Sequence, residues 1–216
     1  MRGNFDQQLL LLNKEMITMG SLCESAIAMS AKALLEGDGA LAKKVPELSE
    51  QIEQKERQIE GLCLKLLLHQ QPVARDLRVI SSALKMVTDM ERIGHQSADI
   101  AEILLVARLT AGEDAQDIHD MALSTIKMVT DAVDAFVRQD VALASAVVRY
   151  DDVVDGYFDK VKENLIRRLR ELGMEAEYAM DLLMIAKYFE RIGDHAVNIA
   201  GWVRFSITGS KEGEVK

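Results

Sequence analysis

The chain has 216 residues, of which 49% are hydrophobic and 28% are charged. This is the composition of a folded globular protein, long enough for one or two small cores. Its 26 basic and 35 acidic side chains leave a formal net charge of −9, so nucleic acid and anionic lipid would repel it. Its apolar runs are too short to span a bilayer, and no apolar signal segment is recognisable. We therefore predict a cytoplasmic protein with no nucleic-acid partner and no direct membrane insertion.

The first half of the chain predicts three long helices. Apolar residues recur at three- and four-residue steps from Leu9 to Cys23, which is the period of a helix face, and Gly37-Asp38-Gly39 ends that helix. Pro46 then starts or kinks a second helix, which Gln70-Gln71-Pro72 breaks. Pro72 suits the first turn of a third helix that runs to about Thr110.

The second half repeats this pattern. Helices are expected over about 113–138, 141–172 and 174–207, with Gly173 at the last turn. Residues 209–216 have almost nothing to bury, so a disordered tail is expected there. Two Pro and 5% aromatic residues also favour helices over strands.

A four-residue sequence occurs twice within these helices. Glu91-Arg92-Ile93-Gly94 reappears 99 positions later as Glu190-Arg191-Ile192-Gly193. Earlier in each half, residues align at an offset of 102, so that Met19 corresponds to Met121. The chain is therefore predicted to be all-α, with six long helices that form two tandem pseudo-symmetric three-helix bundles. The first covers residues 1–111 and the second 112–208.

Each copy of the repeated sequence begins a polar stripe. A spacing of four residues places such side chains on one helix face, where oxygen and imidazole groups can hold a metal ion. Glu53 and Asp155 occupy equivalent positions on the preceding helices and are the predicted partners, within the runs Glu53, Glu56, Glu60 and Asp152, Asp155, Asp159. The alternative is a solvated helix face with ordinary ion pairs. The predicted metal ligands are Glu91, His95, Asp99 and Glu53 in the first copy, and Glu190, Asp194, Asn198 and Asp155 in the second.

Other residues have simpler interpretations. Gly94 and Gly193 lie inside helices, which indicates close helix approach, room for a ligand, or inheritance from a duplication. Cys23 and Cys63 are expected in the core. Four methionines are also expected there, although methionine-rich faces can recognise partner helices: Met86, Met90, Met180 and Met184.

Three blocks of sequence resemble the PhoU family over essentially the whole chain. They are 71–78, which begins Gln-Pro-Val-Ala-Arg-Asp; 91–95, Glu-Arg-Ile-Gly-His; and 190–200, which begins Glu-Arg-Ile-Gly-Asp-His. The resemblance implies paired three-helix bundles, no enzymatic activity and a homodimer. It also implies a negative regulator of phosphate uptake and phosphate-starvation signalling. Such an adaptor connects the ATPase subunit of a phosphate ABC transporter to a membrane sensor histidine kinase.

The resemblance further implies multinuclear metal clusters at Glu/Asp-x-x-x-Asp motifs, with no organic cofactor. The second motif, Glu190-x-x-x-Asp194, is intact, but His95 stands in the first motif where the family has Asp. Imidazole favours Fe, Zn or Ni over Mg, so the two copies are expected to differ in metal preference.

Two other classes of protein also place carboxylates or histidines on the helices of a bundle. A ferritin-like metal-dependent oxidase needs Glu-x-x-His on two helices that face the core, whereas the nearest pattern here is Glu91-x-x-x-His95. A His phosphotransfer bundle needs an exposed acceptor histidine, for which His95 and His195 are the candidates.

Overall fold

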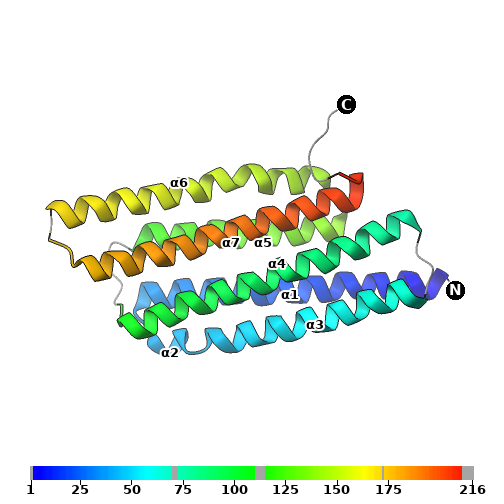
Figure 1. Cartoon of the computed structure of the whole chain (residues 1–216), viewed down its shortest axis with the longest axis horizontal. Helices are drawn as coiled ribbons and strands as arrows, with labels where there is room; N and C mark the ends of the chain where they lie inside the picture. The colour runs from blue at the N-terminus through cyan, green and yellow to red at the C-terminus, as the bar shows by residue number, and fades with distance from the viewer. Residues whose placement is uncertain (1, 70–72, 110–114, 172, 211–216) are drawn as a thin grey trace.

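The computed structural model describes residues 2–69, 73–109, 115–171 and 173–210, and all regular structure in these ranges is helical. This confirms the predicted all-α fold (Figure 1). Six long helices and one short helix follow in chain order: α1 Arg2–Glu36, α2 Gly39–Ala42, α3 Val45–His69, α4 Ala74–Ala107, α5 Ala115–Arg138, α6 Val141–Glu171 and α7 Ala176–Thr208.

The helix ends follow local chemistry. Gly37 adopts a positive φ of 61° directly after α1, a conformation that side chains with a β-carbon rarely adopt. The Asp38 carboxylate then accepts hydrogen bonds from the amides of Ala40 and Leu41, at 2.7 and 3.2 Å. This cap starts the short helix α2, which the sequence pattern did not predict. Pro46 lies in the first turn of α3, while the predicted break at Pro72 is outside the described residues.

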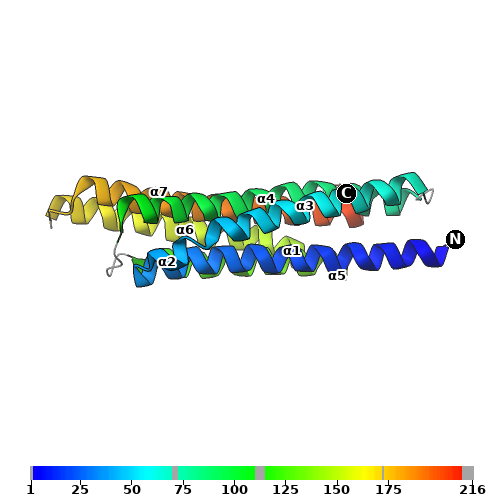
Figure 2. The same cartoon turned by 90° about the horizontal axis from the view of Figure 1, so that it is seen from below.

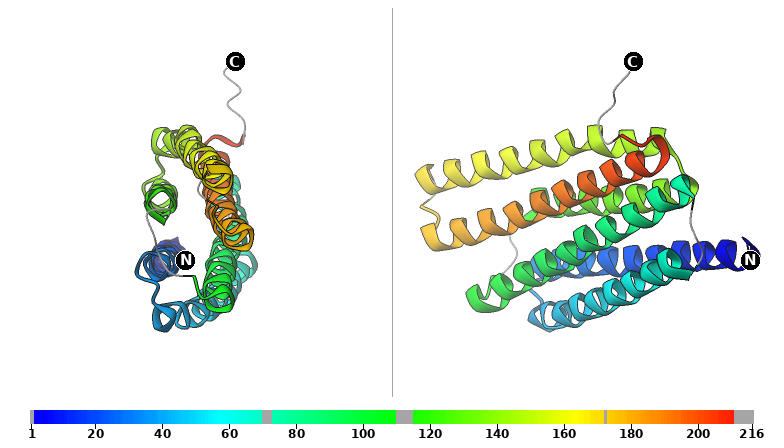
Figure 3. Two further views of the ribbon diagram at one scale, coloured as in Figure 1. Left: turned by 90° about the vertical axis from the view of Figure 1, so that its left-hand side faces the viewer. Right: turned by 45° about the vertical axis from the view of Figure 1, so that its right-hand side comes forward.

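The long helices form two layers. Helices α3, α4, α7 and α6 lie side by side in one layer, and α1 and α5 form the other (Figures 2 and 3). The first repeat comprises α1, α3 and α4, and the second α5, α6 and α7. The repeats meet along two seams, α4 against α7 and α1 against α5. The predicted boundary between residues 111 and 112 is outside the described residues and stays a prediction.

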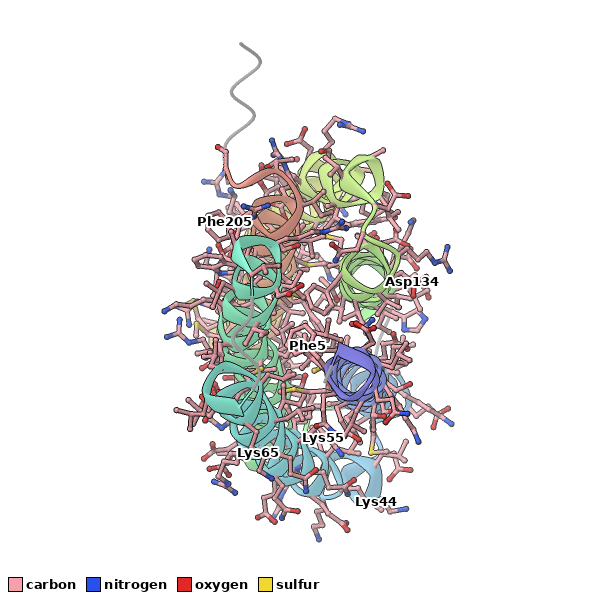
Figure 4. All side chains as sticks on the ribbon, turned by 90° about the vertical axis from the view of Figure 1, so that its right-hand side faces the viewer. Phe5, Lys44, Lys55, Lys65, Asp134 and Phe205 are labelled. Atoms are coloured by element: carbon pink, nitrogen blue, oxygen red, sulfur yellow. The ribbon has the colours of Figure 1, made fainter. Side chains whose placement is uncertain are left out.

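One hydrophobic core runs between the layers and through both repeats. Figure 4 shows Phe5 of α1 pointing into this interior. Cys23 and Cys63 are buried as predicted, and burial raises the pKa of both thiols, for Cys63 to about 12. The Cys23 thiol donates to the Met90 carbonyl oxygen at 3.4 Å. Both cysteines therefore serve as small core residues.

The methionine prediction is right for one pair and wrong for the other. Met86 and Met90 are fully buried, but Met180 and Met184 are exposed. Helix α7 lies inside the four-helix layer, with α4 and α6 at its sides and α5 beneath it. Its remaining face has no covering helix, so apolar residues there meet solvent.

The two glycines of the repeated sequence mark equivalent close helix approaches, which is one of the three explanations that the sequence left open. A β-carbon at Gly94 would lie 3.0 Å from Ile52 Cδ1 of α3, and one at Gly193 would lie 3.3 Å from Val154 Cγ1 of α6. Ile52 and Val154 are also equivalent positions in the repeat. Residues that align between the two halves of the sequence therefore also make equivalent packing contacts in the structure.

Across the described ranges, no helix is both long enough and apolar enough to cross a membrane.

Candidate functional site

The two copies of the repeated sequence meet where α4 crosses α7. Asp89 of α4 contacts two residues in the second half of α7: its Oδ1 lies 3.0 Å from His195 Nδ1 and accepts a hydrogen bond from the Asn198 amide at 3.5 Å. Farther along α4, Asp99 interacts electrostatically with Arg191. The later residue of α4 thus faces the earlier residue of α7, so the helices run antiparallel (Figure 1). The Ile-Gly pairs of both copies lie near the centre of this crossing.

An open pocket of about 830 Å³ lies at the crossing. Its lining is nearly symmetric, since eight of its nine residues are pairs related by the sequence repeat. The pairs are Arg92 with Arg191, His95 with Asp194, Gln96 with His195, and Asp99 with Asn198, and Val197 completes the lining.

Acidic side chains gather where α3 packs against α4. Burial raises the pKa of Glu56, and the neighbouring charges of Glu91 and Glu60 raise it further. The Glu91 carboxylate lies 3.2 Å from His95 Nε2. Glu53 instead pairs with Arg57 on its own helix at 2.7 Å. We call Glu53, Glu56, Glu60, Glu91 and His95 the first acidic cluster.

A more strongly coupled set lies between α6 and α7. Burial, together with the charges of the nearby carboxylates of Asp155 and Asp194, raises the pKa of Asp151 from 3.8 to about 6. Burial and repulsion from Glu190 also raise the pKa values of Asp155 and Asp194. Lys187 offsets part of this charge through an ion pair with Glu190. We call Asp151, Asp155, Glu190 and Asp194 the second acidic cluster.

The structure brings some of the predicted ligands together and separates others. Glu190, Asp194 and Asp155 converge on the second acidic cluster, and Glu91, His95 and Glu53 belong to the first. Asp99 and Asn198 lie on the α4–α7 crossing and belong to neither cluster, whereas His95 and Asp194 belong to a cluster and also line the crossing pocket. A perfect spacing of four drifts around a helix of 3.6 residues per turn, so the last residue of each stripe faces a different neighbour.

Sequence reasoning missed Asp151. Its equivalent in the first repeat is Ser49, so comparison of the two halves offered no signal. A β-carbon at Gly193 would lie 3.2 Å from Asp151 Oδ1, so the glycine gives this carboxylate its space. The available signal was the four-residue spacing from Asp151 to Asp155, which places both on one face of α6.

The donor chemistry of the clusters suits a cation, but their arrangement does not form a finished metal site. Among the described residues, no three His, Cys, Asp or Glu side chains converge closely enough to hold one ion. Several of the carboxylates already make ion pairs, with Arg57, His95 and Lys187. Binding a metal would require these side chains to exchange partners.

The geometry does not favour the two alternative classes of protein. The carboxylates of a ferritin-like site face the core, whereas Glu91, Glu190 and Asp194 are all partly exposed. The His195 side chain is only 13% exposed and contacts Asp89, so it lacks the access that a phosphoryl acceptor needs. His95 is 52% exposed but is paired with Glu91.

Comparison with known proteins identifies this architecture as two copies of one domain. A model of the PhoU domain matches residues 16–104 and 118–203, one match in each repeat. The chain belongs to the PhoU family.

Among its relatives is the phosphate-specific transport system accessory protein PhoU homolog 1 of Thermotoga maritima. It is 34% identical over 208 residues, which cover 95% of this chain and 90% of that protein. The homolog of Pseudomonas aeruginosa is 33% identical, over 95% of this chain and 86% of that protein.

Solved structures agree. The crystal structure of PhoU from Pseudomonas aeruginosa has a TM-score of 0.88 and 32% identity, over 95% of this chain and 100% of that one. The PhoU structure from Streptococcus pneumoniae has a TM-score of 0.86 and 25% identity, over 96% and 99%.

Proposed function

We propose that this chain is a non-enzymatic accessory protein of phosphate transport that represses phosphate uptake and the phosphate-starvation response. The observation that carries the proposal is the match of both repeats to a family whose members are named accessory proteins of phosphate-specific transport. The match spans nearly the whole chain, and both repeats keep the helices that shape the α4–α7 crossing.

In this proposal the chain is a cytoplasmic adaptor between the ATPase subunit of a phosphate ABC transporter and a membrane sensor histidine kinase. The repeat supports such a role, because two similar but non-identical units offer two related surfaces to two partners. The units differ at the crossing itself, where His95 of the first corresponds to Asp194 of the second.

Binding of purified partners tests the adaptor role. The full chain, with its metal content measured, is immobilised and presented with the ATPase subunit and the cytoplasmic part of the kinase, with and without phosphate. We expect retention of both partners and a phosphate-dependent change in at least one. Retention of neither partner under both conditions would contradict the proposal.

The regulatory role needs a separate test in cells. Deleting the gene should leave a phosphate-starvation reporter active in phosphate-rich medium, and the intact chain should restore repression. A reporter that stays repressed after the deletion would show that the chain is not a negative regulator.

We also propose that the acidic clusters bind transition-metal ions. The metal is Fe, Zn or Ni, and each site holds one ion or several. The supporting observation is the second acidic cluster, where four carboxylates share one region with Lys187 as the paired cation. A metal ion would relieve the repulsion among them.

Element analysis of chelator-free protein tests metal binding. Glu190→Ala/Asp194→Ala is compared with the parent and with Glu50→Gln/Glu163→Gln, which removes two exposed carboxylates from α3 and α6. We expect metal loss only in the first variant. Equal metal content in all three proteins would rule out the second cluster as a metal site.

A homodimer is the proposed assembly. Large apolar side chains are exposed on several helices, among them Leu10, Leu64 and Leu68, and association would cover part of this surface. Light scattering after size exclusion should give twice the 24.0 kDa mass of the chain. A monomeric mass across the tested concentrations would refute the dimer.

A further inference from the structure

A second groove lies beside the α4–α7 crossing and has a different chemical character. It occupies about 330 Å³ between the end of α4 and the start of α7. Four carboxylates line it, with apolar side chains between them. We call it the acidic groove and define it by Asp99, Glu102, Ile103, Glu177, Asp181 and Tyr188.

The negative charge of this groove is largely uncompensated. No basic side chain is among its described lining residues, and Glu102, Glu177 and Asp181 make no ion pair within the described chain. Arg191 is a cation beside the groove, and its guanidinium lies over the Tyr188 ring at 5.8 Å. Burial and the charge of Glu102 nevertheless raise the pKa of Asp99, against the lowering effect of Arg191.

Exposed apolar side chains adjoin these carboxylates. Val106, Met180 and Met184 are 78, 57 and 40% exposed. The spacing of Asp181, Met184 and Tyr188 places all three on one face of α7. Methionine is unbranched and polarizable, so such side chains adapt to the surface of a partner helix. This explains exposed methionines that the sequence pattern placed in the core.

The groove is not a by-product of the duplication. The sequence repeat relates the residues of the groove to residues at the opposite end of the α4–α7 crossing. The four carboxylates of the groove correspond there to Arg78, Ser82, Asn198 and Gly201. Ile103 there corresponds to Trp202, whose ring packs edge-on against Phe205 at 5.9 Å. Tyr188 corresponds to Asp89, which contacts His195. One end of the crossing is therefore acidic and open, while the four corresponding positions at the other end carry no carboxylate.

We propose that the acidic groove docks a cationic amphipathic helix of a partner protein. Its acidic edges fit Lys and Arg side chains, and its methionines and Val106 fit the apolar face of such a helix. From Glu177 to Tyr188 the groove follows about 16 Å of α7, or about three helical turns. Anionic lipid would be repelled, and no three of these carboxylates converge on one ion in the described chain.

The proposal deepens the proposed function, because it assigns one partner of the adaptor to a surface. The test compares the full-length parent with Glu102→Gln/Asp181→Asn, which removes two charges from the groove and preserves side-chain size. Glu50→Gln/Glu163→Gln is the matched control, with the same charge change at exposed positions of α3 and α6. Circular dichroism verifies that all three proteins keep the same helicity.

Isothermal titration measures binding of the purified ATPase subunit and of the cytoplasmic part of the kinase. We expect the groove variant to bind one partner at least about tenfold more weakly, with the control unchanged, and salt to weaken parent binding. A groove variant that binds both partners like the parent overturns the proposal. A variant that loses only self-association also overturns it, because the occupant is then a second copy of this chain.

A second measurement separates this proposal from the adaptor role. The probe is a synthetic amphipathic helix of about 18 leucine and lysine residues, and the readout is the methyl NMR signals of the methionines. We expect the probe to shift Met180 and Met184 and to bind the groove variant more weakly than the control. If the parent binds neither partner, the adaptor role fails, but this measurement still shows whether the acidic groove binds a cationic amphipathic helix. Equal binding to both variants, or shifts confined to other methionines, overturns the groove proposal.

Discussion

At the residue scale, Asp151 shows how neighbouring carboxylates alter the energetics of one side chain. Burial first, and then Asp155 and Asp194, raise its pKa from 3.8 to about 6. The folded chain therefore holds this proton more tightly than the unfolded chain between these two values. The stabilisation is present below this window and is lost as the pH rises through the folded pKa.

Asp151→Asn should consequently raise stability relative to the parent above about pH 6 and change it little below about pH 4. The amide keeps the shape of the side chain and removes its charge. Urea unfolding at several pH values measures the difference, with exposed Glu163→Gln as the control. A stability gain that does not vary with pH would contradict the electrostatic origin.

Glycines inside helices differ in what surrounds them. A β-carbon at Gly61 of α3 would have no heavy atom within 4 Å, whereas one at Gly94 would lie 3.0 and 3.3 Å from two carbons of buried Ile52. Gly61→Ala should stabilise the protein by about 0.5–1 kcal/mol through helix propensity. Gly94→Ala should be about 1–3 kcal/mol less stable than Gly61→Ala, because the added methyl group overpacks the α3–α4 contact. Urea unfolding compares them, and equal effects would refute the close approach.

At the element scale, the α4–α7 crossing contains a buried polar contact between the repeats. Asp89 is nearly buried, and its Oδ1 serves both His195 and Asn198. Asp89→Ala should destabilise the protein by about 1–3 kcal/mol, because it leaves polar groups of α7 without their partner.

A double-mutant cycle with His195→Ala isolates this contact. The two substitutions together should cost less than the sum of their separate effects. Strict additivity would mean that the Asp89–His195 contact contributes nothing to the crossing.

At the scale of the whole molecule, the shared core predicts one cooperative unfolding transition. The two repeats pack along both seams, and a single hydrophobic cluster joins them. Leu12 of α1 is fully buried, so Leu12→Ala should cost about 2–5 kcal/mol. Fluorescence of Trp202, the single tryptophan, reports on α7 of the other repeat. Its transition should shift together with far-UV circular dichroism. An unchanged tryptophan transition would mean that the repeats unfold independently.

Local sequence patterns were enough to predict the helical class, the duplication and most helix ends. These properties depend on local patterns: three- and four-residue apolar steps, Gly37 after the first helix, and Pro46 in the first turn of the next. The sequence also singled out Gly94 and Gly193, because a glycine inside a helix carries a cost that recurs in both copies, but it left close helix approach as one of three explanations.

Which polar residues meet depends on how the helices pack against one another. Periodicity reveals which face of a helix is apolar, but not which neighbour covers each remaining face. Asp99 and Asn198 therefore lie on the α4–α7 crossing, Asp151 joins the second acidic cluster, and Met184 meets solvent beside the acidic groove. The antiparallel pairing of the two repeats sets these lateral contacts, and they involve residues about one hundred positions apart. No local pattern encodes such a pairing.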